Sequence, residues 1–134
     1  MLRVTLRVSL LAIAFALAVP TMASAQSSSD VLSDFGLLGT WATDCSRPSG
    51  ADNFYTVYAG MQDGRVRRTY YNTPDREKPY NVYIITRAIR LPADQLSYQQ
   101  EGDVNHDKID VILLKDGKFP GSGAESPWQA KCDG

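Results

Sequence analysis

Residues 37–45 of this chain read Leu-Leu-Gly-Thr-Trp-Ala-Thr-Asp-Cys, with a Gly-x-Trp motif at Gly39 and Trp41 and a cysteine at Cys45. The motif opens a short apolar run that is typical of a β-strand. The chain has one other cysteine, Cys132, which follows a second tryptophan, Trp128, near the C-terminus. These two segments, each with a tryptophan and a cysteine, are predicted to be two edges of one sheet brought together.

The first 25 residues have the pattern of a cleaved signal peptide. Arg3 and Arg7 form a positive segment, residues 10–19 are apolar, and residues 23–25 read Ala-Ser-Ala. The apolar run is only half of the roughly 20 residues that a membrane span needs. Cleavage before Gln26 is therefore expected, with a periplasmic or secreted product and no membrane span. Residues 26–36 are predicted to be a flexible leader, and residues 37–134 a single domain.

The net charge limits the classes of molecule that the protein is expected to bind, and the expected compartment predicts a disulfide. Without its signal the chain keeps 12 basic and 15 acidic residues, a net charge of −3 that disfavours binding to nucleic acid. In an oxidising compartment two cysteines usually pair, so a Cys45–Cys132 disulfide is expected. Free or intermolecular thiols are the alternative. This disulfide would close a loop of nearly the whole domain. By reducing the conformational entropy of the unfolded chain, it would stabilise the fold by about 4 kcal/mol.

Short β-strands alternate with turn signals along the rest of the chain. Asp63-Gly64 and Asp116-Gly117 are hairpin signals, and no long helical pattern occurs. The expected strands span residues 38–43, 54–59, 65–71, 80–91, 95–100, 108–115, 118–119 and 128–132. Seven or eight strands at this spacing predict an all-β fold, a small antiparallel up-and-down barrel that is closed or nearly closed. A β-sandwich is the alternative.

Alternation assigns side chains to the two faces of these strands. In residues 80–91, strict alternation groups Ile84 with Ala88 and places Ile85 on the opposite face. In residues 65–71 it separates Arg68 and Tyr70 from their neighbours Arg67 and Tyr71. Solvated arginines paired with nearby acids are the expectation there, with an anion or sugar site as the alternative.

Gly39-Thr40-Trp41, after a short helical turn, resembles the first strand of lipocalin-like and avidin-like up-and-down barrels. The resemblance implies that Gly39 lets the chain turn into the barrel and that Trp41 packs across its bottom. From residue 39 to residue 132 the chain also looks like a group of small uncharacterised exported proteins of Gram-negative bacteria, which carries no reaction that transfers to this sequence.

Residues 103–110 are the one segment with a metal-ligand pattern. Asp103, Asn105 and Asp107 occupy positions one, three and five of a calcium-loop spacing. The sixth position is Lys108 instead of glycine and the twelfth is Leu114 instead of an acid, so a polar turn is the expectation and these three residues are only a weak candidate site. The single histidine, His106, excludes a histidine-based zinc cluster. No catalytic residue and no cofactor are predicted.

The expected function is therefore binding without catalysis. A periplasmic lipocalin-like protein would hold a small apolar or amphipathic ligand, and the ligand-binding candidates are Tyr58, Tyr70, Ile84 and Tyr98. One alternative is a protein-binding module such as an inhibitor of secreted proteases, with residues 27–35 as its active element. The other is a structural envelope or stress protein.

Overall fold

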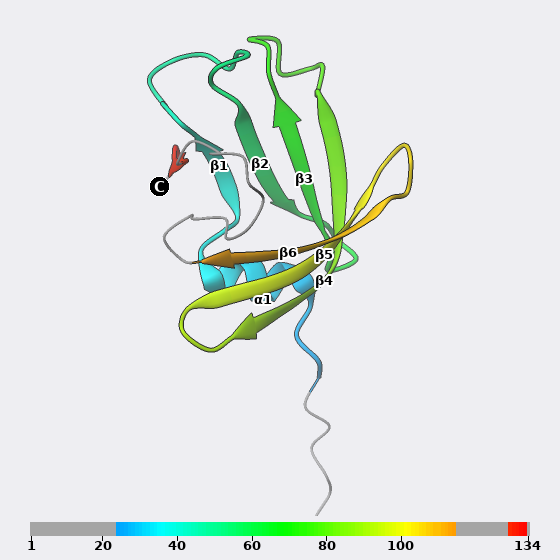
Figure 1. The fold of residues 1–134 in the computed structure, drawn as a ribbon. Helices are drawn as coiled ribbons and strands as arrows, with labels where there is room; N and C mark the ends of the chain where they lie inside the picture. The colour runs from blue at the N-terminus through cyan, green and yellow to red at the C-terminus, as the bar shows by residue number, and fades with distance from the viewer. Residues whose placement is uncertain (1–23, 115–128, 134) are drawn as a thin grey trace, which may run out of the picture.

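The computed structural model describes residues 24–114 and 129–133, which form one helix and seven strands (Figure 1). The single helix described is α1 (Ser28–Phe35). The strands are β1 (Gly39–Ala42), β2 (Tyr55–Gly60), β3 (Val66–Tyr71), β4 (Asn81–Leu91), β5 (Gln95–Gly102), β6 (Lys108–Leu114) and β7 (Ala130–Lys131).

All seven strands belong to one antiparallel sheet with the order β6-β5-β4-β3-β2-β1-β7. The expected all-β, antiparallel architecture is confirmed, and the strand bounds agree with the sequence pattern to within two residues. The described strands make one sheet, so the two-sheet sandwich is wrong for this part of the chain. Within it the sheet is open, with β6 and β7 as its edges, and a closed barrel is not shown. The expected strand at residues 118–119, the Asp116-Gly117 turn and Trp128 lie outside the described residues.

A β-bulge in β4 bends the sheet. The pairing of β4 with β5 shifts register between Ile85 and Arg87, so Thr86 is an extra residue without a partner. The bulge reverses the alternation, and Ala88 joins Ile85 in the buried core. The sequence-based grouping of Ala88 with Ile84 was therefore wrong. Figure 1 shows the result, with β5 and β6 running across the direction of β1, β2 and β3.

Residues 26–36, expected to be a flexible leader, contain helix α1 instead. Ser27 caps the helix, because its hydroxyl accepts a hydrogen bond from the Asp30 amide at 3.1 Å while the Asp30 carboxylate accepts one from the Ser27 amide at 3.2 Å. Gly36 ends it in a left-handed conformation, with φ +84°. The buried face is Val31, Leu32 and Phe35. The correction follows from this apolar spacing, which the Ser-rich composition obscures.

The face of the sheet toward α1, called the inner face below, holds the core. Its members are buried residues of the helix, of the segment after it and of four strands: Val31, Leu32, Phe35, Leu37, Tyr58, Val66, Ile85, Ala88, Leu96 and Tyr98. Each large apolar side chain removed from water contributes about 1.5–3 kcal/mol. The helix thus covers apolar surface that the sheet would otherwise expose.

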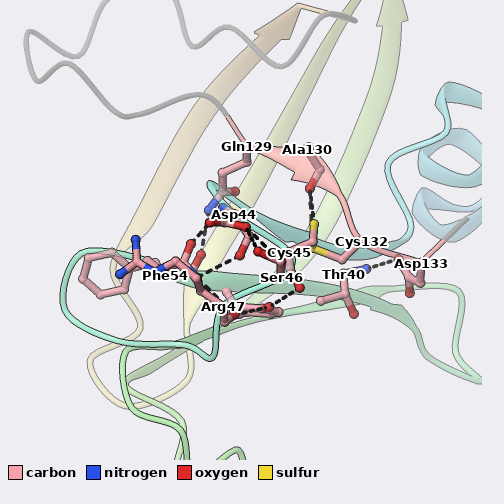
Figure 2. Close-up of a disulfide and its surroundings, with 12 residues drawn as sticks. Thr40, Asp44, Cys45, Ser46, Arg47, Phe54, Gln129, Ala130, Cys132 and Asp133 are labelled. Atoms are coloured by element: carbon pink, nitrogen blue, oxygen red, sulfur yellow. Dashed lines mark hydrogen bonds between the residues drawn. A yellow bond between two sulfur atoms is a disulfide. The ribbon is translucent and has the colours of Figure 1, made fainter.

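The first and last strands are neighbours, as the paired Trp–Cys segments predicted. Trp41 and Ala42 pair with Lys131 and Ala130, and a disulfide joins Cys45 to Cys132 (Figure 2). The Thr40 amide also donates a hydrogen bond to the Asp133 carboxylate at 2.7 Å. Together these contacts attach the C-terminal segment to β1.

Gly39 and Trp41 both have structural roles at this junction. Gly39 has a φ of +126°, and a Cβ atom there would lie 2.7 Å from the Asp133 carboxylate, so both backbone conformation and space favour glycine. The Trp41 indole donates a hydrogen bond to the Leu37 carbonyl at 2.9 Å, and its ring packs against the core.

Two features of the structure bear on the expected location of the protein. A disulfide fits an oxidising, exported location. In the part of the chain that the structure describes, no helix has the length and hydropathy needed to cross a membrane. The predicted signal peptide lies almost entirely in residues 1–23, outside the described residues.

Helix α1 is predicted to be an integral part of the folded domain. Leu32→Ala should lower the free energy of unfolding by about 2–5 kcal/mol, because Leu32 is fully buried against the sheet. Ser33→Ala, at the next and exposed position, should change it by about 0.5 kcal/mol or less. Urea denaturation measures both, and equal effects of the two substitutions would contradict the packing.

The disulfide is predicted to stabilise the fold chiefly through the unfolded chain. Replacing Cys45 and Cys132 by serine opens a loop that spans 87 positions and should lower the free energy of unfolding by about 4 kcal/mol. Urea denaturation of the unreduced protein and the double variant measures the difference. The reduced wild-type protein is the control and should match the variant. A loss below about 1 kcal/mol would show that the loop-entropy account does not apply.

Candidate functional site

Tyrosines from four strands surround a buried arginine on the inner face. Tyr58 on β2, Arg68 on β3 and Tyr83 on β4 lie directly opposite one another across the sheet. Tyr70 follows Arg68 on the same face of β3, and Tyr98 reaches the group from β5. These residues, together with Gln100 of β5, are called the tyrosine–arginine cluster.

The guanidinium of Arg68 is at the centre of the cluster and is 5% exposed. Its Nη1 donates a hydrogen bond to the Oε1 atom of Gln100 at 2.9 Å. Its Cζ atom lies 4.6 Å from the ring centroid of Tyr70 and 5.3 Å from that of Tyr58, distances at which a cation is attracted to an aromatic face. Tyr70 and Tyr83 in turn pack edge to face, with centroids 6.0 Å apart.

Burial and mutual contact set the charge states of these groups. Burial raises the pKa of Tyr58, Tyr70 and Tyr98 above the ordinary tyrosine value, so all three rings keep their hydroxyl protons at neutral pH. Burial works against the charge of Arg68, but the neighbouring tyrosine oxygens outweigh it, and the pKa of Arg68 stays above its usual value. The cluster is thus one cation surrounded by neutral phenols.

The rings of the cluster are not equally buried. Tyr58 and Tyr98 are buried members of the core, whereas Tyr70 and Tyr83 are half-buried and form the accessible side of the cluster. Gln100 is buried beside Arg68. A molecule approaching the cluster would meet the rings of Tyr70 and Tyr83 before the guanidinium.

Three of the four predicted ligand-binding residues come together here, and one does not. Tyr58, Tyr70 and Tyr98 all belong to the cluster. Ile84 lies between Tyr83 and Ile85 in β4 and is therefore on the opposite face, across from Arg67 and Glu101 in the neighbouring strands. Sequence alternation cannot tell which face of a central strand turns inward when both faces are apolar, and that ambiguity explains why Ile84 does not lie with the other three.

Arg68, Tyr83 and Gln100 are members of the cluster that the sequence pattern did not predict. Arg68 was expected to be solvated and paired with an acid, as its neighbour Arg65 is, whose guanidinium contacts the Asp63 carboxylate at 2.6 Å. Instead Arg68 is buried among rings. One signal for it existed: Val66, Arg68 and Tyr70 alternate on one face of β3, and Val66 is an evident core residue.

The calcium-like segment forms a polar turn between β5 and β6. Asn105 and Asp107 hydrogen-bond each other, and His106, with a φ of +56°, lies 3.1 Å from the Glu101 carboxylate. In residues 24–114 and 129–133 there is no group of three or more acidic, histidine or cysteine side chains arranged to hold a metal. His106 is on the surface and outside the cluster.

The cluster combines three kinds of group that can contact another molecule. Aromatic rings offer flat apolar walls, their hydroxyls and the Gln100 amide offer hydrogen bonds, and Arg68 offers a positive charge. Such a combination of apolar walls with a few fixed polar groups is typical of small-molecule sites.

Comparison with known proteins identifies no relative: no family model, no curated protein and no solved structure matches this chain.

The hydrogen bond between Arg68 and Gln100 is predicted to hold the cluster together. Gln100→Leu should lower the free energy of unfolding by about 1–3 kcal/mol, because it removes the acceptor from a buried charged donor. Gln99→Leu makes the same change one residue away on the opposite face and should cost about 0.5 kcal/mol or less. Urea denaturation compares the two, and a more stable Gln100→Leu variant would contradict this role.

Proposed function

We propose that the protein binds a small amphipathic molecule on the inner face of the curled sheet, without transforming it. The polar end of the ligand is directed to the tyrosine–arginine cluster, and its apolar part packs on the rings of Tyr70 and Tyr83. The observation that carries this proposal is the convergence of four tyrosines, from β2, β3, β4 and β5, on the buried guanidinium of Arg68.

Stability alone does not account for this composition. Taking a guanidinium out of water costs several kcal/mol, and well-packed apolar side chains in its place are often neutral or stabilising. Further along the inner face the buried side chains of Leu32, Leu96, Val66 and Ile85 are apolar. Polar groups kept where an apolar core would be more stable are expected at sites of recognition.

The resemblance to lipocalin-like barrels belongs to the same proposal. The curl of the sheet and the Gly39–Trp41 start of β1 support it, since barrel-type binding proteins hold ligands against inward-facing side chains. A periplasmic or secreted location is likewise proposed, and the disulfide supports it.

The alternative of a protease inhibitor has less support from the described residues. It assigned the active role to residues 27–35, which are α1 and its cap residue Ser27, with Val31, Leu32 and Phe35 buried against the sheet. Use of that segment as an inhibitory element would require the helix to leave the core. A catalytic function also has little support, because His106 is exposed and is not a member of the cluster.

Binding can be tested with anilinonaphthalene sulfonate, a fluorescent amphiphile, and with 4-propylphenol as its competitor. The wild-type protein should bind the dye and release it to 4-propylphenol. Tyr70→Ala should weaken both probes about fivefold to tenfold, because it removes one aromatic wall.

Tyr71→Ala is the matched control, since Tyr71 is the next residue, is also half-buried and lies on the opposite face. It should leave binding unchanged, and circular dichroism verifies that both variants fold. Absence of binding to the wild-type protein, or equal weakening by the two substitutions, would overturn the proposal.

A further inference from the structure

The hydroxyl of Tyr98 is the least satisfied polar group of the cluster. Tyr98 is 2% exposed, and its Oη atom has no hydrogen-bond partner among residues 24–114 and 129–133. The hydroxyl of Tyr58 lies close enough to affect its ionisation, but the two do not form a hydrogen bond of standard geometry. Tyr98 is a member of the core, and its hydroxyl is near enough to Arg68 and Tyr58 for both to affect its pKa.

An unsatisfied hydroxyl in this position is costly. A buried donor or acceptor left unpaired costs about 1–3 kcal/mol relative to one that is paired or exposed to water. Phenylalanine would fill the same space without this cost. The tyrosine therefore needs a reason other than packing, and a hydrogen bond formed with a bound molecule supplies one.

Thr56 provides a second, independent observation on the same face. It lies two residues before Tyr58 on β2, opposite Tyr70, and it is 1% exposed. Its Oγ1 atom also has no hydrogen-bond partner in the described part of the chain. Two buried hydroxyls without partners thus lie along the inner face, both next to members of the tyrosine–arginine cluster.

We infer that Tyr98 determines specificity by hydrogen-bonding an oxygen atom at the polar end of the ligand, so that the site takes oxygen-bearing amphiphiles (alcohols, phenols or acids) in preference to hydrocarbons of the same shape. Thr56 offers a second hydrogen bond to an oxygen-bearing group. This inference rests on the proposed function, because it names the chemical class that the same site accepts.

Removal of the Tyr98 hydroxyl is expected to affect stability and ligand binding differently. Tyr98→Phe should leave the midpoint of thermal unfolding unchanged or raise it in the absence of any probe, because the hydroxyl makes no bond in the free protein. The same variant should bind 4-propylphenol about tenfold more weakly, as measured by displacement of anilinonaphthalene sulfonate. Its affinity for propylbenzene, which lacks the oxygen, should match that of the wild-type protein.

Tyr55→Phe is the matched control. The Tyr55 hydroxyl donates a hydrogen bond to the Arg47 carbonyl at 2.7 Å, and Tyr55 lies on the face of β2 opposite Tyr58. Its loss should lower the unfolding midpoint and leave the affinities for both probes unchanged.

The outcomes distinguish this inference from the proposed function. A wild-type protein that binds neither probe removes the proposed function and the inference with it. Wild-type binding with equal affinity of Tyr98→Phe for 4-propylphenol overturns the inference alone and assigns the hydroxyl to a bound water. A lower unfolding midpoint for Tyr98→Phe without probe, or equal weakening of both probes, also overturns it, because the hydroxyl is then part of the packing.

Discussion

The bend of β4 at its bulge is the constraint on which the rest of the structure depends. In a flat sheet, β2 and β5 are three strand spacings apart, about 14 Å. Tyr58 of β2 and Tyr98 of β5 nevertheless belong to one buried core cluster. The extra residue between Ile85 and Arg87 turns the second half of β4, and β5 with it, so that one inner face encloses both the helix and the tyrosine–arginine cluster.

The two ends of this inner face have different chemistry. One end is an apolar core in which Leu32 of α1 packs against residues such as Leu96 and Ile85. The other holds Arg68 among neutral rings. The apolar end provides the hydrophobic stabilisation that lets the fold tolerate a buried cation and unpaired hydroxyls, both of which oppose stability. A rigid core of this kind would keep the polar groups of the proposed binding site in place before a ligand arrives.

The disulfide acts on a different part of the molecule from the bulge and the helix. The Cys45–Cys132 bond joins β7 to β1, and β7 pairs with β1 through only two residues. A strand this short gains little from its own hydrogen bonds, so the disulfide and the Asp133–Thr40 contact account for its position. Within the described residues the disulfide therefore orders the C-terminal segment, while the helix and the bulge shape the inner face.

The amino-acid sequence by itself determined the features that depend on local pattern: the strands with their β-branched and aromatic alternation, the hairpin at Asp63-Gly64, and the pairing of the only two cysteines. It also placed Tyr58, Tyr70 and Tyr98 among the candidates. Only the tertiary structure decided which face of β4 turns inward, because both faces are apolar: Ile84 lies on the outer face, and the bulge after Ile85 brings Ala88 to the inner face. Burial of Arg68, like the packing of α1, also arises from contacts between distant strands, and no local pattern encodes which side chains a curled sheet brings together.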